Sequence, residues 1–129
     1  LKDFASGYSS EEDCAAVIRK IYEEDKYVID THTSVAASVY EKYREETKDE
    51  TPTVIASTAS PYKFARSVLK AIDTKYDSHT DMEQFDDLKE VSGTAIPNAI
   101  EELRSAEVRH KTVVDKDEMQ KAVRNVLGL

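Results

Sequence analysis

The chain has 129 residues, with 18 Lys and Arg against 26 Asp and Glu and a net charge of −8. This length corresponds to one unit, residues 1–129, which is either a small domain or part of a larger one. The acidic balance argues against a nucleic-acid partner, since such proteins need a surplus of Lys and Arg on one face. No apolar run approaches the ~18–20 residues of a membrane-spanning helix, and no signal peptide opens the chain, so we expect no membrane partner.

Metal and redox chemistry find little support in the residue pattern. The single cysteine, Cys14, excludes an internal disulfide and a cysteine-based zinc site, and it suits a reducing, cytoplasmic compartment. The three histidines are His32, His79 and His110, which stand far apart with no second ligand at helical spacing. We therefore expect no metal site.

Helical periodicity dominates the chain. The first helix is predicted over residues 9–26, where Ser9 and Glu12 form an S-x-x-E capping box. A second helix follows from about residue 34 to residue 46, and Ser60 and Pro61 open a third as its cap and first position. Further helices are predicted after Asp81, after Pro97 and after Asp115, with stops at Gly93 and Gly128.

Two short segments have the composition of strands, namely residues 53–56 and 111–114. The fold class predicted from these elements is α/β, mostly helical with two short strands. Two strands are too few for a self-sufficient sheet, which indicates a piece of a larger α/β protein. An apolar surface should then stay exposed and promote self-association.

A polar turn follows the first of these strands. Ser57, Thr58 and Ser60 are candidate nucleophiles, but no G-x-S-x-G elbow surrounds them. The turn places hydroxyl groups beside the free amides of a helix start, which attract polar or anionic groups. From the residues alone, Thr58 either contributes to such a site or simply closes the turn.

Two stretches carry a resemblance to a known family. They are residues 27–36, YVIDTHTSVA, and residues 54–64, VIASTASPYKF. In this order they resemble the C-terminal part of threonine synthase, with its I-D-P-H-T-x-V-A and S-T-A-S/H-P-x-K-F segments; residues 9–12 and 108–116 extend the resemblance. The chain departs from the pattern at Thr31 and Ala65, where the family has proline, and both exchanges affect backbone rigidity rather than chemistry.

The resemblance implies a pyridoxal-phosphate-dependent lyase of threonine biosynthesis, with the fold type II architecture of tryptophan synthase β. The family converts O-phospho-L-homoserine and water into L-threonine and phosphate. By motif position, Thr58 is the residue whose hydroxyl meets the pyridine nitrogen of the cofactor. A hydroxyl, unlike a carboxylate, does not enforce a proton on that nitrogen.

The resemblance also brings four other residues near substrate or cofactor. Asp30 and His32 either approach the site or cap the following helix, Lys63 either faces an anionic substrate or lies in solvent, and Ser57 adjoins Thr58. The family's cofactor-bearing lysine lies toward the N-terminus, and no lysine here has a matching context. We therefore expect this C-terminal fragment to lack a catalytic lysine, to hold no cofactor by itself and to be inactive without the missing N-terminal part.

A different class of function also fits the residue pattern. The chain could be a free-standing, non-catalytic α/β interaction or regulatory domain. Sequence upstream of residue 1 separates the two hypotheses, because the enzyme needs a lysine-containing apolar segment and a Gly-rich loop there.

Overall fold

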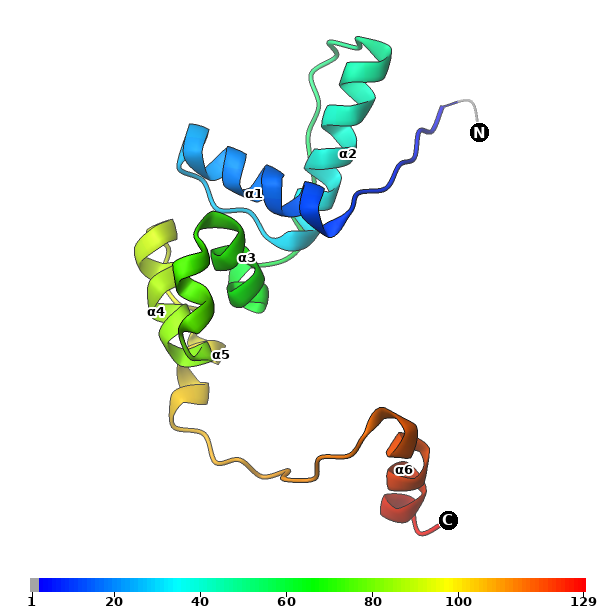
Figure 1. Ribbon diagram of the computed structural model, residues 1–129, viewed down its shortest axis with the longest axis vertical. Coiled ribbons are helices and arrows are strands. Elements are labelled where there is room, and N and C mark those ends of the chain that lie inside the picture. Colours follow the sequence, from blue (N-terminus) through cyan, green and yellow to red (C-terminus); the bar gives the residue numbers. More distant parts are fainter. Residues whose placement is uncertain (1–2) are drawn as a thin grey trace.

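The computed structural model describes residues 3–129 and contains helices joined by extended segments (Figure 1). The α-helices are α1 (Glu11–Asp25), α2 (Thr31–Thr47), α3 (Ala65–Ile72), α4 (Asp81–Ser92), α5 (Asn98–Glu101) and α6 (Met119–Leu127). Short 3-10 helices are η1 (Pro61–Phe64), η2 (Thr74–Ser78), η3 (Glu102–Arg104) and η4 (Lys116–Glu118).

The predicted α/β class is wrong for this structure, since residues 3–129 contain no strand. Both predicted strands, 53–56 and 111–114, are extended but pair with no other segment of the described chain. A strand exists only through hydrogen bonds to a neighbour, and apolar β-branched residues cannot supply one. Val54 and Val113 are accordingly 95% and 93% exposed.

The first helix begins at Glu11 rather than at residue 9, and its cap lies one residue later than predicted, at Ser10. The Ser10 side chain accepts a hydrogen bond from the backbone N–H of Asp13, and the Asp13 carboxylate accepts one from the N–H of Ser10. The capping box is therefore Ser10 with Asp13 rather than Ser9 with Glu12. Ser9 is used elsewhere, because its hydroxyl donates to Ser38 of α2 at 2.7 Å.

The later helix starts also differ in detail from the predictions. Thr80, not Asp81, caps α4, and it forms a capping box with Glu83. Ser60 caps η1 as predicted, with Pro61 at its first position. Asp115 precedes η4, but its side chain makes no capping hydrogen bond. Gly93 ends α4 in the left-handed conformation, as its position predicted.

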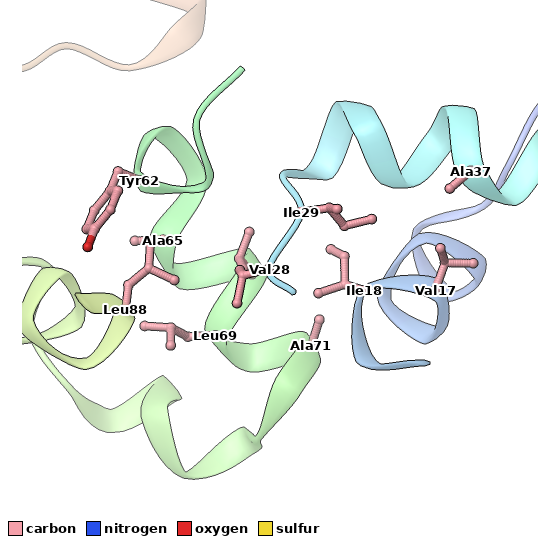
Figure 2. Close-up of a cluster of buried hydrophobic side chains, with 11 residues drawn as sticks. Val17, Ile18, Val28, Ile29, Ala37, Tyr62, Ala65, Leu69, Ala71 and Leu88 are labelled. Atoms are coloured by element: carbon pink, nitrogen blue, oxygen red, sulfur yellow. The ribbon is translucent and has the colours of Figure 1, made fainter. Parts of the chain in front are cut away.

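The core lies where α1 packs on α2 and α3, and where α3 packs on α4 (Figure 2). In Figure 2 the helices contribute Ile18 of α1, Ala71 and Leu69 of α3 and Leu88 of α4, with Val28 between them. Ala65, where the family has proline, is buried in the same core at the start of α3. Burial of Val28 therefore fixes the segment that leads into α2, and burial of Ala65 fixes the start of α3.

The chain beyond η3 leaves this helical body. Residues 105–115 run as an extended segment, and α6 lies at its far end, away from the other α-helices (Figure 1). Its main packing partner is η4, directly before it. Large apolar side chains remain exposed along this region, namely those of Val108, Val113, Val114, Met119, Val123, Val126, Leu127 and Leu129.

Candidate functional site

Asp30 is a buried carboxylate at the start of α2. Its side chain is the N-cap, accepting hydrogen bonds from the backbone N–H groups of His32 at 2.8 Å and Thr33 at 3.3 Å. The hydroxyl of Thr33 donates to its second oxygen. This cap starts α2 at Thr31, three residues before the predicted start. Thr31 takes the first helical position, where proline is also favoured, so the exchange for the family's proline leaves the helix start intact.

The charge of Asp30 is stabilised despite its burial. With 1% of its surface exposed, loss of solvent alone would raise the pKa of the carboxyl group. The hydrogen bonds from Thr33 and from the N–H groups of His32 and Thr33 outweigh that effect, and the net pKa is lowered. Asp30 is therefore an ionised carboxylate at neutral pH, so the groups that hydrogen-bond to it are all donors.

Thr33 joins the two stretches that carried the resemblance. Its Oγ1 lies 3.0 Å from the Oγ of Ser57, which is 24 residues further along the chain. Asp30, Thr33 and Ser57 consequently form one continuous chain of oxygen atoms. Two of the predicted site residues, Asp30 and Ser57, are brought together by a third residue to which the sequence analysis gave no role.

Thr33 carried one signal that sequence reasoning could have used. It stands three residues after an N-cap aspartate, the position from which a side chain reaches back to the cap. Its contact with Ser57 depends on how residues 48–60 run back along α2, and no local pattern encodes that path (Figure 1).

His32 and Lys63 both lie close to the aromatic ring of Phe64. The His32 ring lies 5.0 Å from the ring of Phe64, between centroids, and its Nδ1 is 3.4 Å from the Asp30 carboxylate. The Lys63 ammonium lies 5.4 Å from the same Phe64 ring. Both side chains are exposed, so they can contact a ligand, while Phe64 holds the start of α2 beside η1.

Thr58 lies next to Ser57 on the extended segment and is exposed. Within the described residues its hydroxyl makes no hydrogen bond, whereas the Ser57 hydroxyl is engaged by Thr33. Of this neighbouring pair, Thr58 therefore has the hydroxyl that is free to bind another group.

Two hollows adjoin these residues. A groove of about 710 Å³ between α1, α2 and α3 is lined by His32 and Phe64, with the cationic Arg19 and Lys70 on its walls. A smaller hollow of about 250 Å³ includes Lys63 and Phe64. The lining is mixed in charge, because Glu11 also lines the larger groove and Lys70 already pairs with Asp77 at 2.9 Å. Residues 3–129 hold no cluster of three or more His, Cys, Asp or Glu side chains that could bind a metal ion.

Comparison with known proteins identifies the family. Residues 33–126 match the family described as "Threonine synthase, C-terminal". Threonine synthase of Schizosaccharomyces pombe is 36% identical over 100 residues, covering 74% of this chain. The human protein Threonine synthase-like 1 is 34% identical over 84 residues, covering 65% of this chain. Threonine synthase of Corynebacterium glutamicum is 36% identical over 69 residues, covering 54%.

These matches confirm the resemblance seen in the sequence: the chain belongs to the threonine synthase family and corresponds to its C-terminal region. It spans only 20% of the length of the Schizosaccharomyces pombe protein and 11% of the human one. In the described part of the chain, no helix has the length and apolar character needed to cross a membrane.

Proposed function

We propose that this chain forms one wall of the active site in a pyridoxal-phosphate-dependent threonine synthase. The complete enzyme would convert O-phospho-L-homoserine and water into L-threonine and phosphate. The family match supports this assignment. The free hydroxyl of Thr58 is the observation that supports a cofactor contact at this particular residue.

The residues at the turn fit the proposed cofactor. A pyridine nitrogen needs one hydrogen-bonding partner that does not force it to become protonated, and a hydroxyl has that chemistry. Thr58 offers an exposed hydroxyl with no partner in the described residues, while Ser57 is turned toward α2. When bound, pyridoxal phosphate supplies the electron withdrawal that the reaction requires.

The surrounding side chains would serve orientation and charge. Asp30 fixes the start of α2 and so places His32 against Phe64. Lys63 is exposed and positively charged, and we assign it to attraction of the anionic substrate. His32 borders the groove with Arg19, a second basic side chain that could face an anionic ligand.

The isolated chain should be inactive in this proposal, because no lysine in it stands in the family's cofactor-bearing context. The remaining part of the enzyme would supply that lysine and cover the exposed apolar surface. A groove of about 1010 Å³ between residues 5–10, α2 and residues 53–56 is one such surface. Without that part, we expect the chain to self-associate.

The test is a set of substitutions at the turn, made in the full-length protein that contains this segment. Thr58→Val keeps the side-chain shape and removes the hydroxyl, so turnover should fall roughly tenfold to a hundredfold, the effect of one lost buried hydrogen bond. Thr58→Ser keeps the hydroxyl and should retain most of the activity. Ser57→Ala should reduce turnover less than Thr58→Val does.

Thr53→Val is a matched control. It makes the same chemical change on the same extended segment, at a hydroxyl that bonds only to the nearby carbonyl of Thr51. Thr53 also lines the large groove beside α2, so turnover should fall far less than in Thr58→Val rather than stay identical. If Thr58→Val turned over normally while Ser57→Ala was inactive, the assignment would be wrong by one residue. If neither substitution mattered, the turn would be structural and the proposal for Thr58 would fail.

A further inference from the structure

We propose that Thr33 is a positioning residue that holds Ser57 against α2 and thereby directs Thr58 outward. This inference rests on the proposed role of Thr58. It adds that the hydrogen-bonded side chains of Asp30, Thr33 and Ser57 set the orientation of the Thr58 side chain. It is carried by the continuous chain of oxygens from Asp30 through Thr33 to Ser57.

The order of protons along this chain follows from the chemistry of its members. The ionised Asp30 carboxylate only accepts hydrogen bonds, so the single proton of the Thr33 hydroxyl is used on Asp30. Thr33 Oγ1 then has only lone pairs for Ser57, 3.0 Å away. The Ser57 hydroxyl must therefore donate, and its proton points toward α2.

This contact is an important attachment of the extended segment. Among the described residues, the contact between Thr33 and Ser57 is the hydrogen bond that connects the extended residues 51–59 to a helix, α2. The remaining hydrogen bonds of residues 51–59 are local, such as Thr53 to Thr51. Ile55 adds an apolar contact with the core, two residues before Ser57.

The attachment of Ser57 determines where its neighbour points. Successive side chains on an extended backbone face opposite directions. With Ser57 bonded to α2, the side chain of Thr58 is turned away from α2 and left free. Without the hydrogen bond, rotation of this segment would no longer be restricted at Ser57, and the hydroxyl of Thr58 would lose its fixed direction.

The first experiment measures backbone order in the 129-residue chain by 15N NMR relaxation, with no cofactor present. Thr33→Val preserves the branched shape and removes the hydroxyl, so the order parameters of residues 57–59 should fall from rigid toward flexible values, below ~0.6. Those of α3 should stay rigid. Thr33→Ser restores the hydroxyl and should restore the order. Unchanged order at residues 57–59 in Thr33→Val would overturn the inference.

Two further variants separate positioning from general stability. Ser34→Ala is the matched control, because Ser34 is buried in the same helical turn but its hydroxyl donates to Thr31 rather than to Ser57. It should leave residues 57–59 rigid. Ser57→Ala breaks the same contact from its exposed end, and it should loosen the segment even if Thr33→Val fails to fold.

The second experiment is a double-mutant cycle on turnover in the full-length protein. Thr33→Val alone should lower kcat roughly three- to tenfold with little change in KM, because it acts through Thr58. In a Thr58→Val background it should cost almost nothing further, since no hydroxyl remains to be oriented. Additive losses would overturn the positioning role. A normal Thr58→Val enzyme would instead refute the proposed function, whatever the NMR result.

Discussion

Residues 11–104 and residues 105–129 contain helices of comparable local design, but only the first group is joined by a core. Helix α3 has eight residues, of which Val68 and Leu69 are completely buried between α1 and α4. Helix α6 has nine residues and an apolar side, yet none of its residues is buried. The difference shows that an amphipathic pattern forms a helix in both places, whereas packing depends on a partner surface.

The two regions also differ in charge. Residues 105–129 contain five Lys and Arg against four Asp and Glu, whereas residues 11–104 contain 12 against 21. The helical body is therefore acidic and the C-terminal region is slightly basic. Short isolated helices are only marginally stable in water, so the contribution of α6 to the stability of the body should be small.

The largest expected effect compares one leucine in each region. Leu69→Ala removes a side chain that is 0% exposed, and such substitutions cost about 2–5 kcal/mol. Leu127→Ala makes the same change on α6, where the side chain is 63% exposed, and should stay within about 0.5 kcal/mol. Urea unfolding followed by circular dichroism measures both. Equal losses would mean that α6 packs on the body in solution.

The same contrast explains what the sequence could and could not predict about the fold. Helices bearing caps and apolar stripes, such as those stopped at Gly93 and Gly128, follow from local patterns. The predicted strands at 53–56 and 111–114 did not form, because the sequence pattern reports which residues favour a strand and not whether a neighbouring strand is available. The strands were therefore wrongly predicted because the sequence pattern carries no information about neighbouring strands.

The candidate site shows a similar division. Asp30 was predicted as either a cap or a site residue, and the structure makes it the cap. Asp30 and Ser57 were both assigned to the substrate or cofactor vicinity only through the resemblance, and their hydrogen-bonded link across 27 positions was not predicted. Thr33 was missed because its second partner is set by the tertiary path of the chain. The role of Thr58 stays a prediction.

An intermediate effect compares two aspartates at helix starts. The Asp30 pKa is lowered in the folded state by its hydrogen bonds, which outweigh burial. The stabilisation is therefore complete above the unfolded pKa of ~3.9 and disappears as pH falls through the lower folded value. At pH 7, Asp30→Asn should cost about 1–2 kcal/mol, because a charge-assisted acceptor is lost.

Asp115 provides the matched control for this effect. It also precedes a helical turn, but its exposed side chain makes no capping hydrogen bond. Asp115→Asn should change stability by less than about 0.5 kcal/mol at any pH. Urea midpoints at pH 7 and pH 3 test the pair, and the cost of Asp30→Asn should shrink at the lower pH. A cost for Asp30→Asn that grew on acidification would contradict the lowered pKa.

The smallest expected effect is that of replacing Gly128, which ends α6, and Gly93, which ends α4, is its counterpart in the body. Gly93 and Gly128 both have left-handed backbones, with φ of +66° and +72°, and a Cβ atom would meet nothing within 4 Å at either position. Alanine therefore adds only the backbone strain of the left-handed conformation, about 1–2 kcal/mol.

Gly93→Ala should lower the stability of the body by about that amount, because α4 packs on α3. Gly128→Ala should fray the end of α6 without shifting the midpoint of the main unfolding transition. Thermal unfolding followed by NMR at assigned residues of each helix distinguishes the two results. A shared transition shifted equally by both substitutions would show that the C-terminal region unfolds with the body, and the contrast between the two regions would then be wrong.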